Sequence, residues 1–291
     1  MGKTENRPAE RSSWQLIARR FSKNRLAMAG VALLALMLLA ILLAPAYMPY
    51  DEMIKEDVFN RLQRPGEGGH LLGTDELGRD LLARVLYGGR ISLLGGMATI
   101  AIAFAAGCLI GGAAGYFGGR LDTVLMRFID MLMAIPPVLL AMAILTALGS
   151  GLVNLIISLA ISQIPRFARV VRSAVLTLRG SEYIEAARCY GCSSMKIIVR
   201  HILPNGIGPI IVSATLTLGQ IILSISSMGF LGLGVASPTP EWGTIISENM
   251  LNIRYYPYLG LVPGVCICLA VMAVNFIGDG LRDAFDPRTG N

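Results

Sequence analysis

Six long apolar stretches dominate the sequence and limit what the chain can fold into. They lie at about 26–45, 92–114, 131–149, 151–166, 207–234 and 258–279. A helix needs about 20 apolar residues to cross the hydrocarbon core of a bilayer. Only 15% of all residues are charged, whereas soluble domains have about 25%. The sequence therefore predicts an all-α integral membrane protein with six transmembrane helices, and it excludes a disordered chain or a typical soluble enzyme.

Lysine and arginine residues are distributed unevenly among the polar segments between these stretches. If the N-terminus lies in the cytoplasm, the inner segments carry most of the 25 Lys and Arg residues. Cytoplasmic segments of membrane proteins carry such an excess. We therefore predict that the N-terminus and the C-terminus are both cytoplasmic. The first stretch is predicted to remain as an anchor helix, because its apolar run is longer than that of a cleaved signal peptide.

These features divide the chain into segments of different character. We predict a cytoplasmic N-terminal amphipathic segment at 1–25, a first transmembrane helix at 26–45, a periplasmic segment with an amphipathic helix at 46–91, a core with five transmembrane helices at 92–280, and a cytoplasmic tail at 281–291. Six spans of about 20 residues leave ample room for the connecting loops.

Two segments beside the first span are amphipathic. The residues at 14–21 place an apolar face opposite basic side chains. This pattern suits either a helix on the inner membrane surface or a basic flank that fixes the topology. The segment 74–89 has its leucines on one half of the helical wheel. Thr74 is its predicted N-cap, and Gly88 and Gly89 are predicted to end it.

The sequence offers little support for catalysis. It contains no HExxH, GxSxG or P-loop motif, so we predict no catalytic residue and no nucleotide or cofactor site on this chain. His70 and His201 fall on opposite sides of the predicted membrane and cannot share a metal ion. Cys189 and Cys192 have the spacing of half a zinc site, but no second pair exists to complete four ligands. We therefore predict no metal site.

Several residues inside the apolar stretches predict helix packing. Asp130 lies three residues after Arg127, and the two are predicted to form an ion pair on one helix face. Pro136 and Pro137 are predicted to kink the same helix. Four glycines recur at every fourth position and predict the close approach of another helix: Gly107, Gly111, Gly115 and Gly119.

The most informative polar segment is GSEYIEAARCYGCSSMKIIVRHILPN at 180–205. Its pattern predicts two short helices, with Ser181 as the cap of the first and Gly191 in a turn with positive φ. Pro204 is predicted to end the run, and Ile198 and Ile202 form one apolar ridge. A helix pair tethered between two spans suits docking into a groove on a cytosolic protein. The alternative is a connector that packs only on its own bundle.

This segment resembles the EAA loop of ABC-importer permeases. The pattern of that loop is matched, at the expected spacing, by Glu185, Ala186, Ala187, Gly191, Leu203 and Pro204. His201 stands where the general pattern has isoleucine, and the form HILPN resembles the peptide/nickel branch. Segments 20–30, 71–93 and 279–288 are similar to the "C" permease subunit of peptide and nickel importers. The resemblance covers nearly the whole chain.

The resemblance implies an ABC importer permease (MetI-like) fold in the cell inner membrane. It implies a heterodimer with a sister permease, two cytosolic ATP-binding subunits that hold ATP and Mg, and a periplasmic solute-binding protein. Segment 180–205 would be the coupling helix that seats on one ATPase subunit. No nucleic-acid partner is implied.

The expected solutes are dipeptides or short oligopeptides, and the alternatives are nickel, glutathione or another small peptide-like solute. A secondary transporter is disfavoured, because no chain of acidic residues crosses the predicted membrane. The residues that touch the solute are not identified by the sequence. Gln163, Gln220 and Ser224 are polar residues within spans, and hydrogen bonds between helices would explain them equally well.

Overall fold

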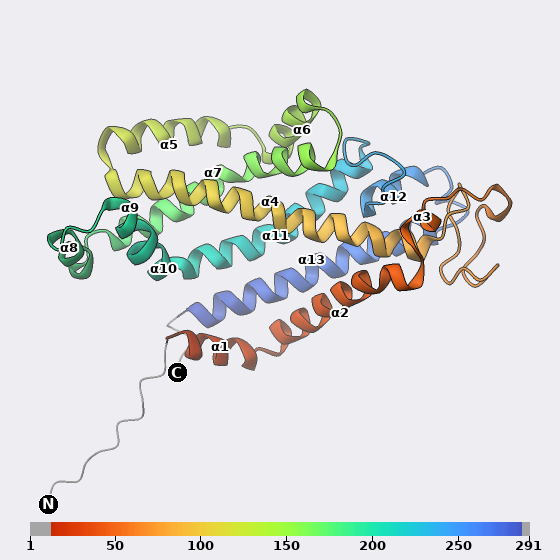
Figure 1. The fold of residues 1–291 in the computed structure, drawn as a ribbon, viewed down its shortest axis with the longest axis horizontal. Coiled ribbons are helices and arrows are strands. Elements are labelled where there is room, and N and C mark those ends of the chain that lie inside the picture. Colours follow the sequence, from red (N-terminus) through yellow and green to blue (C-terminus); the bar gives the residue numbers. More distant parts are fainter. Residues whose placement is uncertain (1–12, 287–291) are drawn as a thin grey trace, which may run out of the picture.

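The fold was obtained as a computed structural model that describes residues 13–286. The remaining parts of the predicted segments 1–25 and 281–291 lie outside the described residues. Long helices run side by side along the longest axis of the molecule (Figure 1). The helices in chain order are α1 (Ser13–Lys23), α2 (Arg25–Tyr47), α3 (Tyr50–Met53), η1 (Val58–Asn60), α4 (Leu81–Phe117), α5 (Gly119–Met133), α6 (Pro137–Leu148), α7 (Leu152–Leu178), α8 (Glu182–Cys189), α9 (Ser194–Lys196), η2 (Ile197–Ile202), α10 (Leu203–Asn205), α11 (Ile207–Phe230), α12 (Trp242–Glu248) and α13 (Tyr258–Phe285).

The all-helical prediction is confirmed, and several helices can cross a bilayer. Within the described residues, α2, α4, α11 and α13 are long and apolar enough to do so. The pair α5 and α6 is a possible fifth span, broken by a bend of 88°. The predicted kink at Pro136 and Pro137 is therefore confirmed, because these prolines lie at that break. The sixth predicted span falls in α7, which has 27 residues but carries three arginines. The count of six spans stays a prediction.

Helix α4 corrects the prediction of a separate helix over 74–89. It begins at Leu81, after Asp80 caps it by accepting a hydrogen bond from the Ala83 amide at 2.7 Å. It then continues through Gly88 and Gly89 for 37 residues. These two glycines do not end the helix. They are positions at which other helices pack closely against α4. A Cβ atom on Gly89 would lie 2.6 Å from Cδ1 of Ile41 in α2.

Helix α7 corrects a second predicted boundary. The fourth apolar stretch is predicted to end at about 166, yet α7 continues through Pro165 and on to Leu178. Proline is tolerated inside membrane helices where neighbouring helices support the backbone. Here α4 provides that support, since Phe167 and Ala168, two and three residues after the proline, are fully buried and contact α4.

The glycine stripe of α4 is the reason for this close contact. A Cβ atom on Gly107 would lie 2.4 Å from Cβ of Phe167, and one on Gly111 would lie 2.2 Å from the carbonyl oxygen of Ala168. Gly115 meets α7 in the same way. The predicted packing role is confirmed for these three glycines. Gly119 instead begins α5 with a φ of +57° and has no atom within 4 Å of its Cβ position.

We expect Gly111→Val to destabilise the protein by forcing α4 and α7 apart. Overpacking of a tight contact costs about 1–3 kcal/mol. The midpoint of thermal unfolding of the full chain in mild detergent measures this effect. Gly264→Val in α13 is the matched control, because nothing lies within 4 Å of the Cβ position of Gly264. Equal midpoints for the two variants would contradict the packing role of Gly111.

Two ion pairs hold α5 against α7. Oδ1 of Asp130 accepts a hydrogen bond from Nη2 of Arg169 at 2.6 Å. The predicted pairing of Asp130 with Arg127 is therefore wrong, because the carboxylate faces α7 rather than its own helix. One turn further along α7, Arg172 contacts both carboxylate oxygens of Asp122, each at 2.6 Å. A bidentate pair of this kind fixes the relative orientation of two helices.

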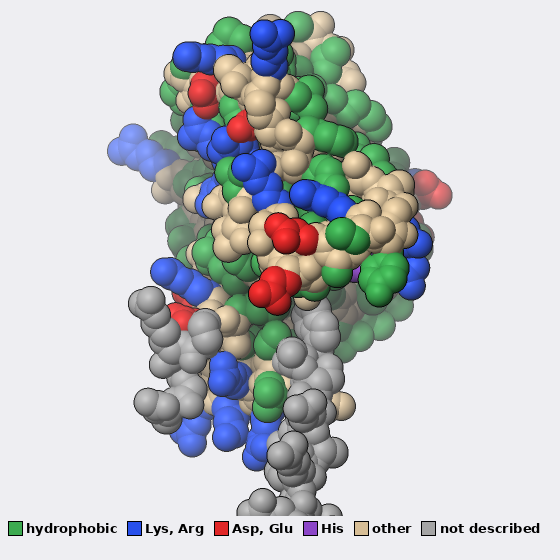
Figure 2. All heavy atoms as spheres, turned by 90° about the vertical axis from the view of Figure 1, so that its left-hand side faces the viewer, with side chains coloured by type: hydrophobic (Ala, Val, Ile, Leu, Met, Phe, Trp, Pro, Cys, Tyr) green, Lys and Arg blue, Asp and Glu red, His purple; other side chains and the backbone are tan. Residues whose placement is uncertain are grey.

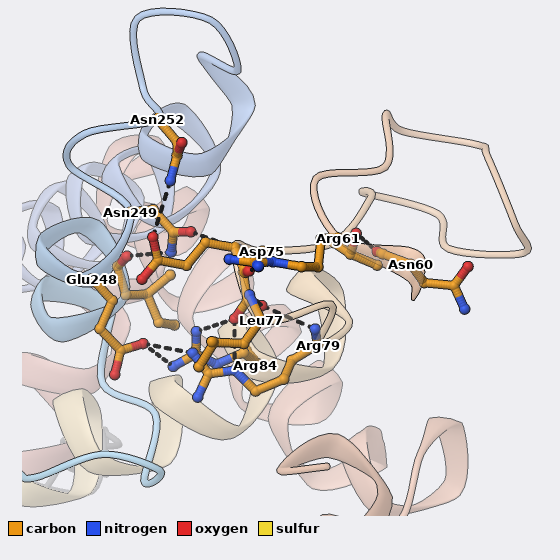
Figure 3. A network of polar contacts seen from close by, with 12 residues as sticks. Asn60, Arg61, Asp75, Leu77, Arg79, Arg84, Glu248, Asn249 and Asn252 are labelled. Atoms are coloured by element: carbon orange, nitrogen blue, oxygen red, sulfur yellow. Dashed lines mark hydrogen bonds and ion pairs between the residues drawn. The ribbon is translucent and has the colours of Figure 1, made fainter. Parts of the chain in front are cut away.

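A buried charge cluster lies at the end of the bundle where α4 begins (Figure 3). It consists of Asp75, Arg79, Arg84 and Glu248. Oδ2 of Asp75 accepts from Nε of Arg79 at 2.7 Å and from Nη1 of Arg84 at 2.5 Å. Oε2 of Glu248 accepts from Nη2 of Arg79 at 2.9 Å and from Nη2 of Arg84 at 2.6 Å. The cluster thus joins the segment before α4 to α12.

The segment before α4 is irregular rather than helical, which changes the role of Thr74. Its predicted role as an N-cap is wrong, because α4 begins seven residues later. The Thr74 hydroxyl instead donates to the carbonyl of Asn60 and accepts from the amide of Gln63. These bonds join the part of the segment around residues 60–63 to the part around Thr74, beside the charge cluster.

Candidate functional site

The candidate site is the connector between α7 and α11, which we define as residues 179–206. It contains α8, α9, η2 and α10, and it lies at the end of the bundle opposite the charge cluster (Figure 1). α1 begins and α13 ends toward this same end of the bundle (Figure 1). The predicted helical character of the segment 180–205 is confirmed.

One face of the connector packs on its own bundle. Ile184, Ile197 and Ile202 are fully buried. They pack with Val171 and Val175 of α7 in one apolar cluster. The ridge of Ile198 and Ile202 predicted from the sequence is therefore directed inward. This burial makes the connector a firmly attached part of the helix bundle.

The opposite face of the connector is exposed and carries Glu185 and Ala186 of the EAA motif. Ala187 is half-buried and packs against the apolar cluster of the inner face. Two large apolar side chains of the connector are also exposed: Tyr190 is 88% exposed and Met195 is 61% exposed. Exposed apolar side chains next to small residues mark a surface that a partner can approach closely.

The turn after α8 has the geometry of a Schellman motif. Gly191 has a φ of +75°, as the sequence predicts. Its amide donates to the carbonyl of Arg188 at 2.9 Å, and the amide of Cys192 donates to the carbonyl of Ala187 at 3.1 Å. This pair of bonds defines the motif. The turn fixes the angle at which the chain leaves α8.

Two details of the predicted connector differ from the structure. Ser181 is the N-cap residue of α8, but its side chain makes no capping bond, since its hydroxyl donates to the carbonyl of Leu178. Pro204 does not end the helical run, which continues to Asn205 in α10. The run before the proline includes η2, a π-helical turn in which the amide of Leu203 donates to the carbonyl of Ile198.

The connector is also attached to the last turn of α4, a contact that the sequence did not indicate. Nη1 of Arg179 donates to the carbonyl of Gly115 at 3.0 Å. The guanidinium of Arg188 lies 5.0 Å from the centre of the Tyr116 ring. No sequence signal joins these residues, because they lie more than 60 positions apart. The contacts make the connector and α4 one mechanical unit.

The exposed end of the molecule carries charges of both signs. Glu182 and Glu185 lie in the first turn of α8 and Arg188 in its last turn, an arrangement that suits the helix dipole. Viewed from this end, acidic side chains lie among apolar and basic ones (Figure 2). Within residues 13–286, no three His, Cys, Asp or Glu side chains are grouped as a metal site would require.

The described residues thus form a bundle of helices, several of them able to span a membrane, with an exposed helical connector at one end. The sequence profile of the binding-protein-dependent transport system inner membrane components matches residues 76–291. The profile of the N-terminal transmembrane domain of oligopeptide transport permease C matches residues 12–65. The chain belongs to this family of binding-protein-dependent importer permeases.

Curated relatives are similar over nearly their whole length. The dipeptide transport system permease protein DppC of Alkalihalophilus pseudofirmus is 42% identical over 277 residues, which are 95% of this chain and 90% of the relative. The glutathione transport system permease protein GsiD of Pectobacterium atrosepticum is 40% identical over 279 residues, which are 96% of this chain and 92% of the relative.

The fold also has a solved counterpart. An inward-facing structure of the MetNI methionine ABC transporter aligns with a TM-score of 0.53 and 21% identity. The alignment covers 71% of this chain and 96% of that chain. The likeness confirms the MetI-like permease fold that the sequence implies.

Proposed function

We propose that this chain is a permease subunit of an ATP-driven importer that moves dipeptides or short oligopeptides across the cell inner membrane. The observation that carries the proposal is the similarity, over 95% of the chain, to a dipeptide transport permease. The chain itself is not an enzyme in this proposal. ATP and Mg bind to partner subunits, and a periplasmic binding protein delivers the solute.

The proposed topology has six spans, with the α5–α6 pair and α7 completing the set. Both termini and the connector lie in the cytoplasm. Two observations support this arrangement. The start of α1, the end of α13 and the connector lie toward one end of the bundle (Figure 1). The segments at this end also hold most of the Lys and Arg residues of the chain.

In this proposal the connector is the coupling helix for one of two cytosolic ATP-binding subunits. A sister permease completes the path as a heterodimer. The small side chains of Ala186 and Ala187 allow a partner to approach the α8 backbone. Glu185 offers a charge to a basic group on that partner, and Gly191 sets the turn. Leu203 and Pro204 belong to the helical run that joins the connector to α11. Because the inner face of the connector is buried, movement of a docked subunit is passed to the bundle.

Glutathione is the second candidate solute. Relatives of similar identity, including one of Escherichia coli O157:H7, are glutathione transport permeases. Glutathione and dipeptides share peptide bonds and free carboxylates, so the same path would suit both. The delivering binding protein is expected to decide between them.

Uptake of labelled solutes tests the proposal in cells that lack only this chain. We expect loss of uptake of a labelled dipeptide, a pentapeptide or glutathione, with recovery on restoration of the wild-type chain. Labelled nickel is measured in parallel. The control is a chain with Glu185, Ala186 and Ala187 replaced, which should enter the membrane without restoring uptake. Unchanged uptake of all four solutes would contradict the proposal.

A further inference from the structure

Arg166 stands out among the charged residues of the membrane helices. It lies at the middle of α7, where Nη1 donates to Oε1 of Gln220 in α11 at 2.6 Å. The other two arginines within α7, Arg169 and Arg172, form ion pairs with carboxylates of α5. Among the described residues, no carboxylate forms an ion pair with Arg166, whose partner is a neutral amide. Arg166 differs in this respect from the other two arginines of α7, although Asp286 lines the same groove.

Four polar residues lie along one side of α11, a helix that also exposes Leu223 and, at its C-cap, Leu231. Ser213, Gln220, Ser224 and Ser227 follow one another at steps of seven, four and three residues, which places them on one side of the helix. All four are at least partly accessible. We call this set the polar stripe. The opposite side of α11 is apolar and buried in the bundle, for example at Ile225.

A groove runs along this face toward the connector end of the molecule. Its volume is about 860 Å³, and its lining includes Arg166, Ser213 and Leu216. Arg282, near the end of α13, also lines it. Sites for small molecules have volumes of about 300–1,000 Å³, so the groove has room for a short peptide.

Contact with lipid does not suit this face. An arginine at the centre of a membrane helix costs about 2.5–3.5 kcal/mol when it faces lipid, and such residues face a bundle interior or a water-filled cavity. Arg166 is half-buried and opens into the groove. Of the polar stripe, Ser213 lines the groove and Gln220 contacts Arg166 directly. The part of this face around Arg166 therefore borders water rather than acyl chains.

We propose that Arg166 and the polar stripe line the solute path, and that Arg166 binds the carboxylate of the passing solute. The proposal rests on the proposed import function. The guanidinium supplies the charge that a peptide carboxylate needs, and the hydroxyl and amide groups can bond to peptide N–H and C=O groups. Dipeptides and glutathione both carry such carboxylates. The guanidinium would not bind a bare divalent cation, so the inference favours peptide-like solutes over nickel.

Uptake by four variants separates charge from a structural role. We expect Arg166→Gln to reduce uptake of the labelled peptide by about tenfold or more, because the path loses its charge. Arg166→Lys should keep uptake within about threefold of wild type for the same reason. Gln220→Ala should reduce uptake less than Arg166→Gln does, because it removes one hydrogen-bonding group and no charge. Arg169→Gln is the matched control, since its charge is paired with Asp130. The membrane content of each variant is measured by immunoblot.

Equal losses in Arg166→Gln and Gln220→Ala would overturn the proposal, because the pair would then act only as a link between α7 and α11. A loss in Arg166→Lys as large as that in Arg166→Gln would overturn it as well. If the wild-type chain restores no peptide or glutathione uptake, the import function fails. If it does so and the Arg166 variants transport normally, only the present inference fails.

Chemical labelling tests, independently of transport, whether this face of α11 is in contact with water. Single cysteines replace Ser213 or Ser224 in a chain whose native cysteines are alanines and which retains uptake. A charged methanethiosulfonate reagent modifies thiolates in water. We expect both positions to react about tenfold faster than Leu36→Cys, which lies mid-way along α2 and is 63% exposed there. Equal rates at all three positions would overturn the proposal.

Discussion

Replacing Gly191 with valine should abolish solute uptake while the chain still inserts into the membrane. Gly191 has a φ of +75°, a conformation that a β-branched residue adopts only with strain of about 1–3 kcal/mol. No atom lies within 4 Å of its Cβ position, so the strain comes from the backbone and not from a clash. The variant should lose the Schellman turn and change the direction in which the chain leaves α8.

Gly191→Asn is the matched control for this prediction, because asparagine tolerates positive φ better than other residues with a side chain. It should retain a large part of the wild-type uptake. Uptake of the labelled peptide and membrane content are measured for both variants, together with the ATP-binding subunits that co-purify. The valine variant should lose these subunits. Normal uptake by Gly191→Val would show that the turn has no role in coupling.

The second large effect is expected at the charge cluster. Arg84 is fully buried and binds both Asp75 and Glu248. Arg84→Met leaves two carboxylates with Arg79 as their only cation in the cluster. Loss of one partner from a buried ion pair costs about 3–5 kcal/mol, because the other charge stays buried without compensation. We expect a large fall in the thermal unfolding midpoint of the full chain in detergent.

A double variant distinguishes lost charge balance from lost packing. In Arg84→Met with Glu248→Met, the remaining Asp75 and Arg79 still form their own pair at 2.7 Å. Replacing whole buried pairs with apolar residues is often nearly neutral. The double variant should therefore be more stable than Arg84→Met alone. If both are equally unstable, the cause is lost packing rather than unbalanced charge.

The local features of the connector could be predicted from the sequence because they depend on neighbouring residues. The positive φ of Gly191 follows from its place after a short helix with a charged pattern. The glycine stripe of α4 likewise follows from a fixed spacing along one helix, and three of its members meet α7. Apolar length was enough to identify α2, α4, α11 and α13 as possible spans.

The features that failed depend on residues far apart in the chain. Gly88 and Gly89 look like a helix end until Trp242, more than 150 residues away, is seen packed against them. Asp130 pairs with Arg169, which lies 39 positions away on another helix, and not with the nearer Arg127. The sequence also gives no indication of the role of Glu241, which is fully buried and accepts hydrogen bonds from the hydroxyls of Ser92 and Ser226. A single sequence holds no signal for such pairings.

Helix α4 is continuous over its 37 residues and can therefore act as a rigid rod between two attachment points. Arg84 lies in its first turn within the charge cluster, and Tyr116 lies in its last turn against Arg188 of the connector. At 1.5 Å per residue, about 48 Å of continuous helix separates these two attachments. A tilt imposed at one attachment must appear at the other, since the rod has no joint between them. In the proposed importer, contacts made on the far side of the membrane and the docking of an ATP-binding subunit at the connector would then bias each other reciprocally.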